Sequence, residues 1–385
     1  MTKSVYISGA ARTAMGGMQG ALAGATAAEL GGAAIAAAVA RAGNPAVDAV
    51  FMGCVLPAGQ GQAPARQASF AGGLPEQTPC TTLNKMCGSG MQALMMASDA
   101  IWAGSARTIV AGGMESMTRA PYLLPKMRGG ARLGHAQALD HMFLDGLEDA
   151  YDKGRLMGTF AEDCAGAFGF TRQAQDDYAL ASLSRASAAI SSGAFKAEIT
   201  PVTLSGRKGE TVVDTDEQPG NARPEKIPTL KPAFRKDGTV TAANSSSISD
   251  GAAALVVSDR AEGAIARIVG YASHAQAPAD FPTAPVPATE KLLEQIGWSK
   301  DDVDLWEVNE AFAVVPMAFM ARMDVPHDKV NVNGGACGLG HPIGASGARI
   351  VVTLIHALQA RGLRQGVAAI CIGGGEGTAI AVELV

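Results

Sequence analysis

The sequence has little charge, few aromatic residues and few cysteines. Of its 385 residues, 17% are charged, 5% are aromatic and 48% are hydrophobic. Intrinsic disorder is excluded, because a disordered chain combines low hydrophobicity with high charge. Uninterrupted apolar runs stay below the roughly 18 residues of a membrane-spanning helix, and residues 1–10 lack the apolar core of a secretory signal. We therefore expect a globular, cytoplasmic protein with no membrane partner.

Three further features that the sequence lacks exclude classes of function. An excess of basic residues is missing, since the formal net charge is −5, and this argues against a nucleic-acid partner. The six cysteines follow neither a disulfide-scaffold spacing nor a zinc-site spacing, so we expect reduced thiols and no metal. A P-loop pattern is missing, and the glycine-rich stretch Gly338–Gly344 is one residue too long for a dinucleotide fingerprint. The sequence thus predicts a protein without a bound cofactor.

Small residues are abundant instead, with 47 glycines, and the length predicts two or three packed units. Strand, helix and strand follow one another over residues 5–8, 91–103 and 108–111, an order typical of parallel-sheet α/β units. From about Arg119 to Ala243 the chain carries more charge and proline, which indicates an insertion. The insertion has one clear helix, Arg172–Ser191, and short strands and loops over 202–232. After Ala252 the α/β rhythm returns, with helices expected over 289–296 and 348–359 and strands over 253–257, 265–269, 303–308, 330–332 and 367–372.

The two halves resemble each other around their glycine-rich turns. Asn84–Gly90 precedes an apolar helix in the first half, and Asn333–Gly344 precedes one in the second. Each turn brings a reactive residue to the start of its helix, Cys87 in one copy and His341 in the other. The common order of elements predicts a duplicated α/β unit with a pseudo-twofold relation.

Four residues have the chemistry for nucleophilic catalysis, although each also has a structural explanation. A helix N-terminus favours an anion and lowers a thiol pKa, so Cys87 is either a nucleophile or a structural thiol. His341, in a loop of glycines, is a candidate general base for it. Cys371 ends an apolar strand, where sites form in parallel sheets, and a thiol there can exchange protons or simply fill space. Asn309 either orients a water or a carbonyl, or caps a helix.

Eight stretches of the chain, taken together, resemble the thiolase family, and within it the short-chain acetyl-CoA C-acetyltransferases, or acetoacetyl-CoA thiolases. Each stretch alone is moderately specific, whereas eight in the same order from one end of the chain to the other are very specific. The stretches are Met1–Gly20, Gly53–Gly59, Asn84–Gly90, Gly112–Met117, Asn244–Ala254, Asn309–Ala313, Asn333–Gly344 and Cys371–Gly377.

The resemblance implies a role for each candidate residue. Cys87 would be the nucleophile that becomes acylated. His341 would activate it and, with a water held by Asn309, form the oxyanion hole for the thioester enolate. Cys371 would be the second acid–base residue. The backbone N–H groups of Cys87 and Gly373 would stabilise the tetrahedral oxyanion, and such donors each matter by about 10²–10³ in rate. The implied activity is thiolysis of acetoacetyl-CoA or condensation of two acetyl-CoA, by a ping-pong mechanism through acyl-Cys87.

The same resemblance implies the fold, a five-layer αβαβα arrangement of two similar α/β halves with an inserted loop domain. Residues 1–116, completed by about 243–263, would form the N-terminal half, and residues 264–385 the C-terminal half. Residues 117–242 would form the loop domain, which binds coenzyme A and makes oligomer contacts. We expect a homotetramer, a dimer of dimers, with residues 119–142 as its tetramerisation loop. Acyl-CoA substrates, no cofactor and a place in fatty acid metabolism are also implied.

The resemblance further implies contacts with the substrate. Ser246 matches the position that contacts the CoA pantetheine. The positions that line the CoA and acyl tunnel match Met157, Phe234, Ala243 and Phe312. The candidate phosphate partners, for which a solvated charged loop is the more common explanation, are Arg223, Arg207, Lys208 and Lys226.

Three positions depart from the pattern of the family. Leu156 stands where biosynthetic members commonly have a histidine, which removes a polar group near the acyl pocket. Phe281 stands where a methionine is common, and a phenylalanine there also occurs in members that accept 2-methyl-branched acetoacetyl-CoA. Branched or somewhat longer 3-ketoacyl-CoA are therefore expected as further substrates. Glu376 adds a carboxylate where an uncharged residue is usual, and we expect it past the turn, facing solvent.

Other functions fit parts of the sequence. A broader-range degradative 3-ketoacyl-CoA thiolase would use the same residues. A ketoacyl-synthase-type condensing enzyme combines one cysteine with two histidines, or with a histidine and an asparagine, whereas this chain has Cys371 as a second thiol. A non-catalytic acyl- or sterol-binding relative would have lost its nucleophile or base, whereas Cys87 and His341 are both present.

Overall fold

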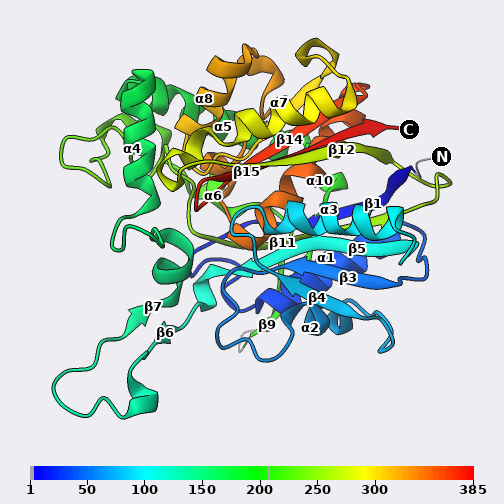
Figure 1. Cartoon of the computed structure of the whole chain (residues 1–385), viewed down its shortest axis with the longest axis horizontal. Coiled ribbons are helices and arrows are strands. Elements are labelled where there is room, and N and C mark those ends of the chain that lie inside the picture. The colour runs from blue at the N-terminus through cyan, green and yellow to red at the C-terminus, as the bar shows by residue number, and fades with distance from the viewer. Residues whose placement is uncertain (1–3, 207–208) are drawn as a thin grey trace.

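The body of the protein is built in five layers (Figure 1). The structure is a computed structural model that describes residues 4–206 and 209–385. Two helices lie in the middle, α3 (Ser89–Trp102) and α10 (Ile343–Arg361), and a sheet packs on each side of them. The outer faces of the sheets are covered by α1 (Ala27–Arg41) and α2 (Pro64–Ala71) on one side and by α7 (Pro285–Ile296) and α8 (Val314–Met323) on the other. The expected five-layer fold is therefore confirmed.

The two sheets repeat one strand order. In the first, β3, β5, β11 and β1 are neighbours in that order, with β4 beyond β3. In the second, β13, β14, β15 and β12 follow in the same order. The first pair of each series is parallel and the next two pairs are antiparallel, as a duplicated unit requires. Strands β1 and β12 also pair with each other and join the sheets. The strands are β1 (Val5–Thr13), β3 (Ala49–Gly53), β4 (Cys80–Leu83), β5 (Thr108–Ser116), β11 (Ser249–Ser258), β12 (Ala266–Ala275), β13 (Leu305–Val308), β14 (Gln365–Ile372) and β15 (Glu376–Leu384).

Two expectations about the strands are wrong. The sheets are mixed rather than parallel, because only a short turn at Gly373–Gly375 separates β14 from β15, and a tight turn joins antiparallel neighbours. The strand expected over 330–332 is an irregular segment with one isolated bridge, from Val330 to Trp306. Asn331 has a φ of 50°. Its side-chain amide pairs with both the N–H and the C=O of Val308, each at 2.8 Å, in place of a backbone ladder.

The inserted segment is richer in structure than its sequence indicates. The predicted helix Arg172–Ser191 is present as α5 (Arg172–Ser192), and the expected short strands form the hairpin β9 (Val202–Gly206) and β10 (Gly209–Val213). Helix α4 (Met157–Phe168) was not predicted, because Leu156 at its N-cap provides no side-chain hydrogen bond. The remaining short elements are β2 (Gly16–Gly17), β6 (Tyr122–Leu123), β7 (Leu139–Asp140), β8 (Ile199–Thr200), α6 (Glu217–Asn221) and α9 (Ala336–Leu339).

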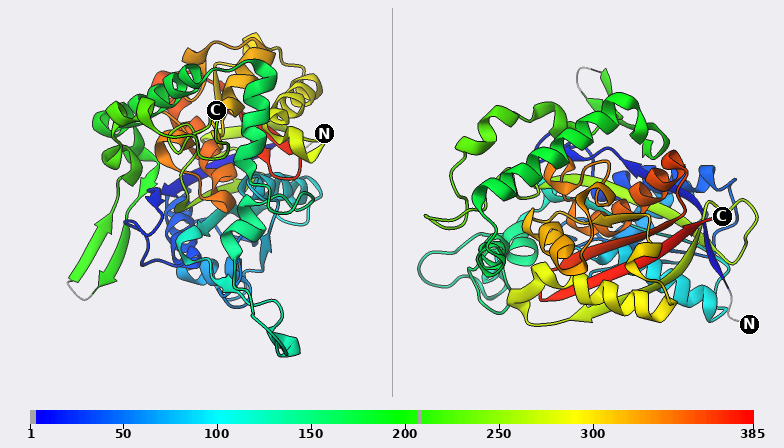
Figure 2. Two further views of the ribbon diagram at one scale, coloured as in Figure 1. Left: turned by 90° about the vertical axis from the view of Figure 1, so that its left-hand side faces the viewer. Right: turned by 90° about the horizontal axis from the view of Figure 1, so that it is seen from above.

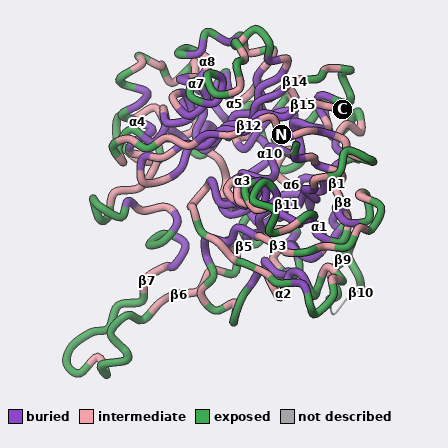
Figure 3. Tube along the Cα trace, turned by 45° about the vertical axis from the view of Figure 1, so that its right-hand side comes forward, coloured by how far each residue is buried: buried purple, intermediate pink, exposed green. Residues whose placement is uncertain are grey.

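Two parts of the insertion project from the body. Figure 2 shows the β9–β10 hairpin and the excursion that contains β6 and β7 as separate protrusions. In Figure 3 the excursion is exposed along most of its length, whereas the layered body is buried. The excursion carries apolar side chains that are largely exposed, among them Tyr122, Leu124, Met127 and Leu133.

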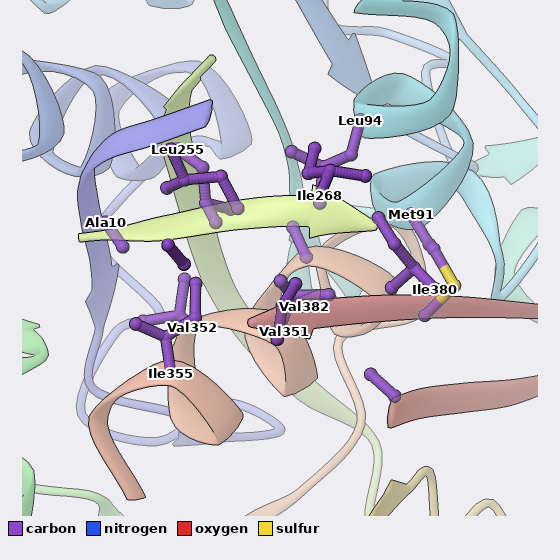
Figure 4. Packing of buried hydrophobic residues seen from close by; sticks show 14 of the residues in the cluster. Ala10, Met91, Leu94, Leu255, Ile268, Val351, Val352, Ile355, Ile380 and Val382 are labelled. Carbon is purple, nitrogen blue, oxygen red and sulfur yellow. The ribbon is translucent and has the colours of Figure 1, made fainter. Parts of the chain in front are cut away.

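The central helices pack in backbone contact near their first turns. A Cβ on Gly90 of α3 would lie 2.6 Å from the nitrogen of Ala348, and one on Gly347 of α10 would lie 2.5 Å from that of Met91. Real Cβ atoms do not approach so closely, so only glycine permits this crossing. Beyond the contact, Figure 4 shows Met91 and Leu94 of α3 and Val351 and Val352 of α10 among side chains from β11, β12 and β15.

Helix α10 is long and apolar enough to span a membrane by length and composition alone. However, 83% of its most apolar window is buried inside the fold. Burial from all sides by two sheets explains the apolar composition of this helix, since a helix surrounded by protein needs no polar face.

A buried cluster of charges fixes the inserted segment to β1. Arg12 of β1 donates from Nε to Glu198 at 2.6 Å and from both terminal nitrogens to Asp216 at 2.7 and 2.9 Å, and its guanidinium lies over the Phe195 ring. All three charged side chains are essentially inaccessible. Burial opposes the charge of Arg12, but the two carboxylates raise its pKa above the ordinary value. Each charge therefore depends on its partners to remain ionised.

We predict that Arg12→Met destabilises the protein by about 3–5 kcal/mol, because it leaves two buried carboxylates uncompensated. The matched control is Arg267→Met, which removes the partly exposed pair with Glu383 and is expected to cost no more than about 1 kcal/mol. Thermal unfolding followed by circular dichroism compares the variants. Equal shifts in Tm for both would contradict the prediction.

Candidate active site

One cavity brings together reactive groups from both halves and apolar residues from the insertion. Its volume is about 380 Å³. Cys87 at the entrance to α3, His341 before α10 and Gly373 after β14 lie in its wall. The rest of the wall is mostly apolar, apart from three serines. It consists of Phe143, Gly146, Leu147, Leu156, Met157, Gly158, Ala233, Phe234, Ala242, Ser245, Ser246, Ser247, Ile248, Phe281, Ala311, Phe312 and Ile343.

A tight turn presents Cys87 to the cavity. Met86 has a φ of 47°, which a residue with a side chain rarely adopts. The turn is held by side chains, since Asn84 Oδ1 accepts from the Met86 N–H at 2.9 Å. Ser89 Oγ accepts from the Lys85 N–H at 2.8 Å and donates to the Met86 carbonyl at 2.6 Å. Strain at Met86 thus exposes the next residue, Cys87, at the N-terminal end of the helix.

The environment of the Cys87 thiol raises its pKa to about 11. Burial is the main cause. The backbone N–H groups of Gly373 and of Cys87 itself act in the opposite direction, and the carboxylate of Glu115 adds to the increase. The expectation from the helix N-terminus alone, a lowered pKa, is therefore wrong, because desolvation outweighs the donors. Cys87 is a neutral thiol at neutral pH and needs a base.

The His341 ring is buried and oriented by a serine. Its Nδ1 lies 2.5 Å from Ser346 Oγ, whose own proton goes to the Pro342 carbonyl at 2.9 Å. Ser346 must then accept from Nδ1–H, so the lone pair is on Nε2. Within the part of the chain that is described, Nε2 has no hydrogen-bond partner. Burial, with a further contribution from Arg349, lowers the His341 pKa to about 3. The ring is thus a neutral acceptor near Cys87.

A carboxylate that the residue-by-residue reasoning did not select holds the surrounding loops. Glu115 of β5 is fully buried and accepts from the N–H groups of Val55, Leu56 and Gly344 at 2.9, 3.1 and 2.9 Å. Burial raises its pKa to about 7 in spite of these three donors. Glu115 therefore fixes the start of α10, three residues after His341, against the first half. In the sequence, Glu115 is marked by the stretch Gly112–Met117, in which this acidic residue follows an apolar strand.

Two further candidates, Cys371 and Asn309, lie beside the cavity rather than in its wall. Cys371 is fully buried in β14, two residues before Gly373. Burial, and then the proximity of Cys87, raise the Cys371 pKa. Asn309 is fully buried in the turn that leads to Ala311 and Phe312, and neither of its amide side-chain atoms has a partner among the described residues. A buried amide without partners is costly, so this side chain is available to a ligand or a water.

Most of the residues expected to contact the substrate line this cavity. Most of the others line a neighbouring cavity. Ser246, Met157, Leu156, Phe234, Phe281 and Phe312 are in the wall with Cys87. Ala243 and Arg223 line a neighbouring cavity of about 320 Å³, together with Lys226. Both cavities have Ala242, Ser245 and Ser247 in their walls, so they are adjacent. Arg207 and Lys208 lie outside the described residues.

The three departures from the family pattern have definite environments. Leu156 is the N-cap of α4 and lines the cavity. Phe281 is buried and makes edge-on contacts with the rings of Phe160 and Phe312. Glu376, expected to face solvent, instead forms an ion pair with Lys85. The part of the chain that the structure describes contains no cluster of three His, Cys, Asp or Glu residues suited to a metal ion.

Several wall residues were not selected from the sequence. Phe143 and Leu147 come from the end of the excursion, Ile248 directly precedes β11, and Ile343 is the first residue of α10. Phe143–Leu147 forms a short π-helical turn, whose apolar residues stand in a polar stretch. This contrast in polarity is the one sequence feature that distinguishes Phe143 and Leu147. Their place in the cavity wall depends on the fold, which brings together distant parts of the chain.

Comparison with known proteins shows the family of the chain. Residues 5–261 match the family model "Thiolase, N-terminal domain", and residues 263–384 match "Thiolase, C-terminal domain". An acetyl-CoA acetyltransferase from Escherichia coli is 50% identical, with 99% of each chain covered. One from Pseudomonas aeruginosa is 48% identical, with 98% of each chain covered.

Two solved structures are also similar over the whole chain. The Bacillus anthracis acetyl-CoA acetyltransferase superposes with a TM-score of 0.96 at 41% identity, covering 100% of this chain and 99% of that one. A thiolase from Ascaris suum, in complex with coenzyme A, has a TM-score of 0.93 at 42% identity, and both chains are fully covered. With matches of this length over both halves, the chain belongs to the thiolase family.

Proposed function

We propose that the protein is an acetyl-CoA C-acetyltransferase that cleaves acetoacetyl-CoA with coenzyme A and runs the reverse condensation. One observation supports this most directly. Cys87 with its neutral thiol, His341 with its unpaired Nε2, and Gly373 line a single cavity, and an adjacent cavity is lined by basic residues. The full-length similarity to acetyl-CoA acetyltransferases supports the choice of substrate.

In the first half-reaction, His341 Nε2 takes the proton of Cys87 as the sulfur attacks the 3-keto carbon of acetoacetyl-CoA. Both groups rest in the neutral state, so the transfer accompanies attack rather than preceding it. The N–H groups of Cys87 and Gly373 stabilise the tetrahedral oxyanion. The C2–C3 bond then breaks, the acetyl group stays on Cys87, and the enolate of acetyl-CoA takes its proton from Cys371.

In the second half-reaction, the Cys371 thiolate takes the proton of coenzyme A, and the CoA sulfur attacks acetyl-Cys87. Acetyl-CoA leaves, and imidazolium His341 returns its proton to the Cys87 thiolate. Asn309 holds a water that, with His341, stabilises the enolate, and this use fits its unpaired buried amide. Two thiols with raised pKa values suit this exchange, since each accepts a proton readily once deprotonated.

In this proposal, different parts of the substrate contact different residues of the two cavities. Ser246 faces the pantetheine arm, and its hydroxyl is positioned by donation to the Ala311 carbonyl at 3.0 Å. Met157, Phe234 and Phe312 enclose the thioester end of the substrate. In the neighbouring cavity, Ala243 lines the wall, and Arg223 and Lys226 provide positive charge for the CoA phosphates. Residues 117–242 thus form the loop domain that receives coenzyme A.

We also propose an oligomeric state, a cell compartment and a metabolic role for the protein. A homotetramer, a dimer of dimers, would cover the exposed apolar residues of the excursion, such as Tyr122, Met127 and Leu133. The enzyme would act in the cytoplasm, in the formation or breakdown of fatty-acid-derived acyl-CoA, with acyl-CoA as its partner.

A second candidate function is a broader-range 3-ketoacyl-CoA thiolase. The specific observation in its favour is the apolar wall beside Cys87, with Leu156, Leu147 and Phe143 in the place where a polar pocket would restrict the acyl chain. An apolar wall admits an added methyl or methylene at little cost.

We predict that Cys87→Ser abolishes turnover, since a serine in this apolar site lacks the acidity and nucleophilicity of the thiol. Intact-protein mass spectrometry after incubation with acetoacetyl-CoA should detect an acetyl adduct on the unmodified protein and none on the variant. The control is Cys80→Ser, which alters a thiol on β4 outside the cavity wall and should leave the adduct unchanged. Full activity of Cys87→Ser would refute the mechanism.

The acyl preference is tested with three substrates under CoA-dependent cleavage. Acetoacetyl-CoA should give the highest kcat/KM, 2-methylacetoacetyl-CoA should be accepted, and 3-ketohexanoyl-CoA should be slower by about tenfold or more, because two extra methylenes must fit the same cavity. Equal or better cleavage of 3-ketohexanoyl-CoA would favour the broader thiolase. Loss of the 3-ketoacyl thioester absorbance measures each rate.

The lowered pKa of His341 predicts a pH-dependent contribution to stability. In the unfolded chain this histidine is protonated below its ordinary pKa of 6.5, whereas in the fold it stays neutral down to about 3. Its contribution is therefore complete above pH 6.5 and is lost as the pH falls, by about 1.4 kcal/mol per pH unit. Urea unfolding of His341→Gln should show a shallower fall between pH 6.5 and 4.5 than the unmodified protein. The exposed His135→Gln should behave like the unmodified protein, and parallel curves for all three would contradict the prediction.

A further inference from the structure

One ion pair connects the two glycine-rich loops of the site. Lys85 Nζ, in the turn that precedes α3, pairs with Glu376 Oε2 at the start of β15, although the two residues are 291 positions apart in the chain. Lys85 is two residues before Cys87, and Glu376 is three residues after Gly373. The pair therefore connects the turn of Cys87 to the turn of Gly373, two residues that line the same cavity.

The two turns that the ion pair connects are held in different ways. On the first side, the Lys85 N–H is fixed by Ser89 Oγ at 2.8 Å. On the second side, Glu376 is held in the ladders with β14 and β12, and the Gly375 carbonyl accepts from the Gln276 N–H at 2.8 Å. Between these points and the end of β14, Gly373 and Gly374 have no side chains to hold them, and Gly374 has a φ of 96°. An anchored lysine that reaches across to the residue after this turn restricts where the turn lies.

The exposure of the pair argues against a role in stability alone. The Lys85 side chain is 24% exposed and that of Glu376 is 38% exposed. Pairs with this access to solvent contribute little to the free energy of folding. Their geometric effect remains, because displacing a catalytic donor by about an ångström costs up to 10²-fold in rate.

Building on the proposed function, we propose that Lys85 and Glu376 are positioning residues whose ion pair clamps the Gly373 turn against the Cys87 turn and sets the aim of the Gly373 N–H at the reacting sulfur. The pair also keeps the charge near Cys87 neutral. The other charged group that acts on the thiol is Glu115, which is held separately by three backbone donors.

The test removes the pair without leaving an isolated charge beside Cys87. The double variant Lys85→Met with Glu376→Gln should lower kcat for acetoacetyl-CoA cleavage by about tenfold, with KM and Tm nearly unchanged, because the cavity proposed to receive CoA is lined by other residues. The matched control is Arg267→Met with Glu383→Gln, which deletes the 2.7 Å pair at the other end of β15 and should leave kcat unchanged.

A charge swap separates positioning from a general structural effect. Lys85→Glu with Glu376→Lys preserves the combined length of the two side chains and the sign complementarity, so kcat should return to within about threefold of the unmodified protein. A neutral double variant with full kcat would overturn the proposal. So would a swap as slow as the neutral variant, or an equal loss in the control pair.

A second readout does not depend on turnover. The rate of Cys87 alkylation by iodoacetamide should fall several-fold in the neutral double variant and recover in the swap, because the Gly373 N–H stabilises the thiolate. If the unmodified protein neither cleaves acetoacetyl-CoA nor forms an acetyl adduct, the proposed function fails, while the alkylation rates still decide whether the clamp exists. Unchanged alkylation in the neutral variant would overturn the clamp.

Discussion

The structure depends on the direct backbone contact between the first turns of α3 and α10. Because Gly90 and Gly347 have no side chains, the two helices cross close to the point where each begins. The residues just before each helix, Cys87 and His341, are thereby brought to one cavity although they belong to different halves. A bulkier residue at either glycine would separate the helices and, with them, the thiol and the imidazole. The packing of the core and the geometry of the site are thus set by the same contact.

Buried charges make this arrangement specific. Glu115 collects N–H groups from two loops of different halves, and Arg12 joins β1 to the insertion. Such groups are costly unless every partner is in place, so they select one arrangement of loops among many that an apolar core would tolerate. Burial has a second effect at the site itself. It keeps Cys87 and His341 neutral, so that charge develops only when a substrate carbonyl is there to receive it.

Much of the fold and of the site could be predicted from the sequence, and the limits have physical causes. The duplicated turns were visible because glycine and a reactive residue recur before an apolar helix in both halves. The antiparallel neighbours of β5 and β14 were not, because strand periodicity carries no information about direction. The strand expected at 330–332 failed because an asparagine side chain replaces the backbone ladder. The raised pKa of Cys87 and the partner of Glu376 depend on residues distant in sequence, which local patterns do not contain.

The strand order also governs how the chain can fold during synthesis. Strand β1 is made first, yet its neighbours in the sheet are the short β8, which pairs with its last two residues, and β11 and β12, which end at Ser258 and Ala275. Until β11 and β12 have left the ribosome, most of β1 has no lateral partner and its apolar side chains are uncovered. Pairing over such sequence separations is slow, because a long loop must close before any contact rewards it. The nascent chain therefore carries an unpaired strand for most of its synthesis, and this makes it a natural client for chaperones that shield exposed strand edges.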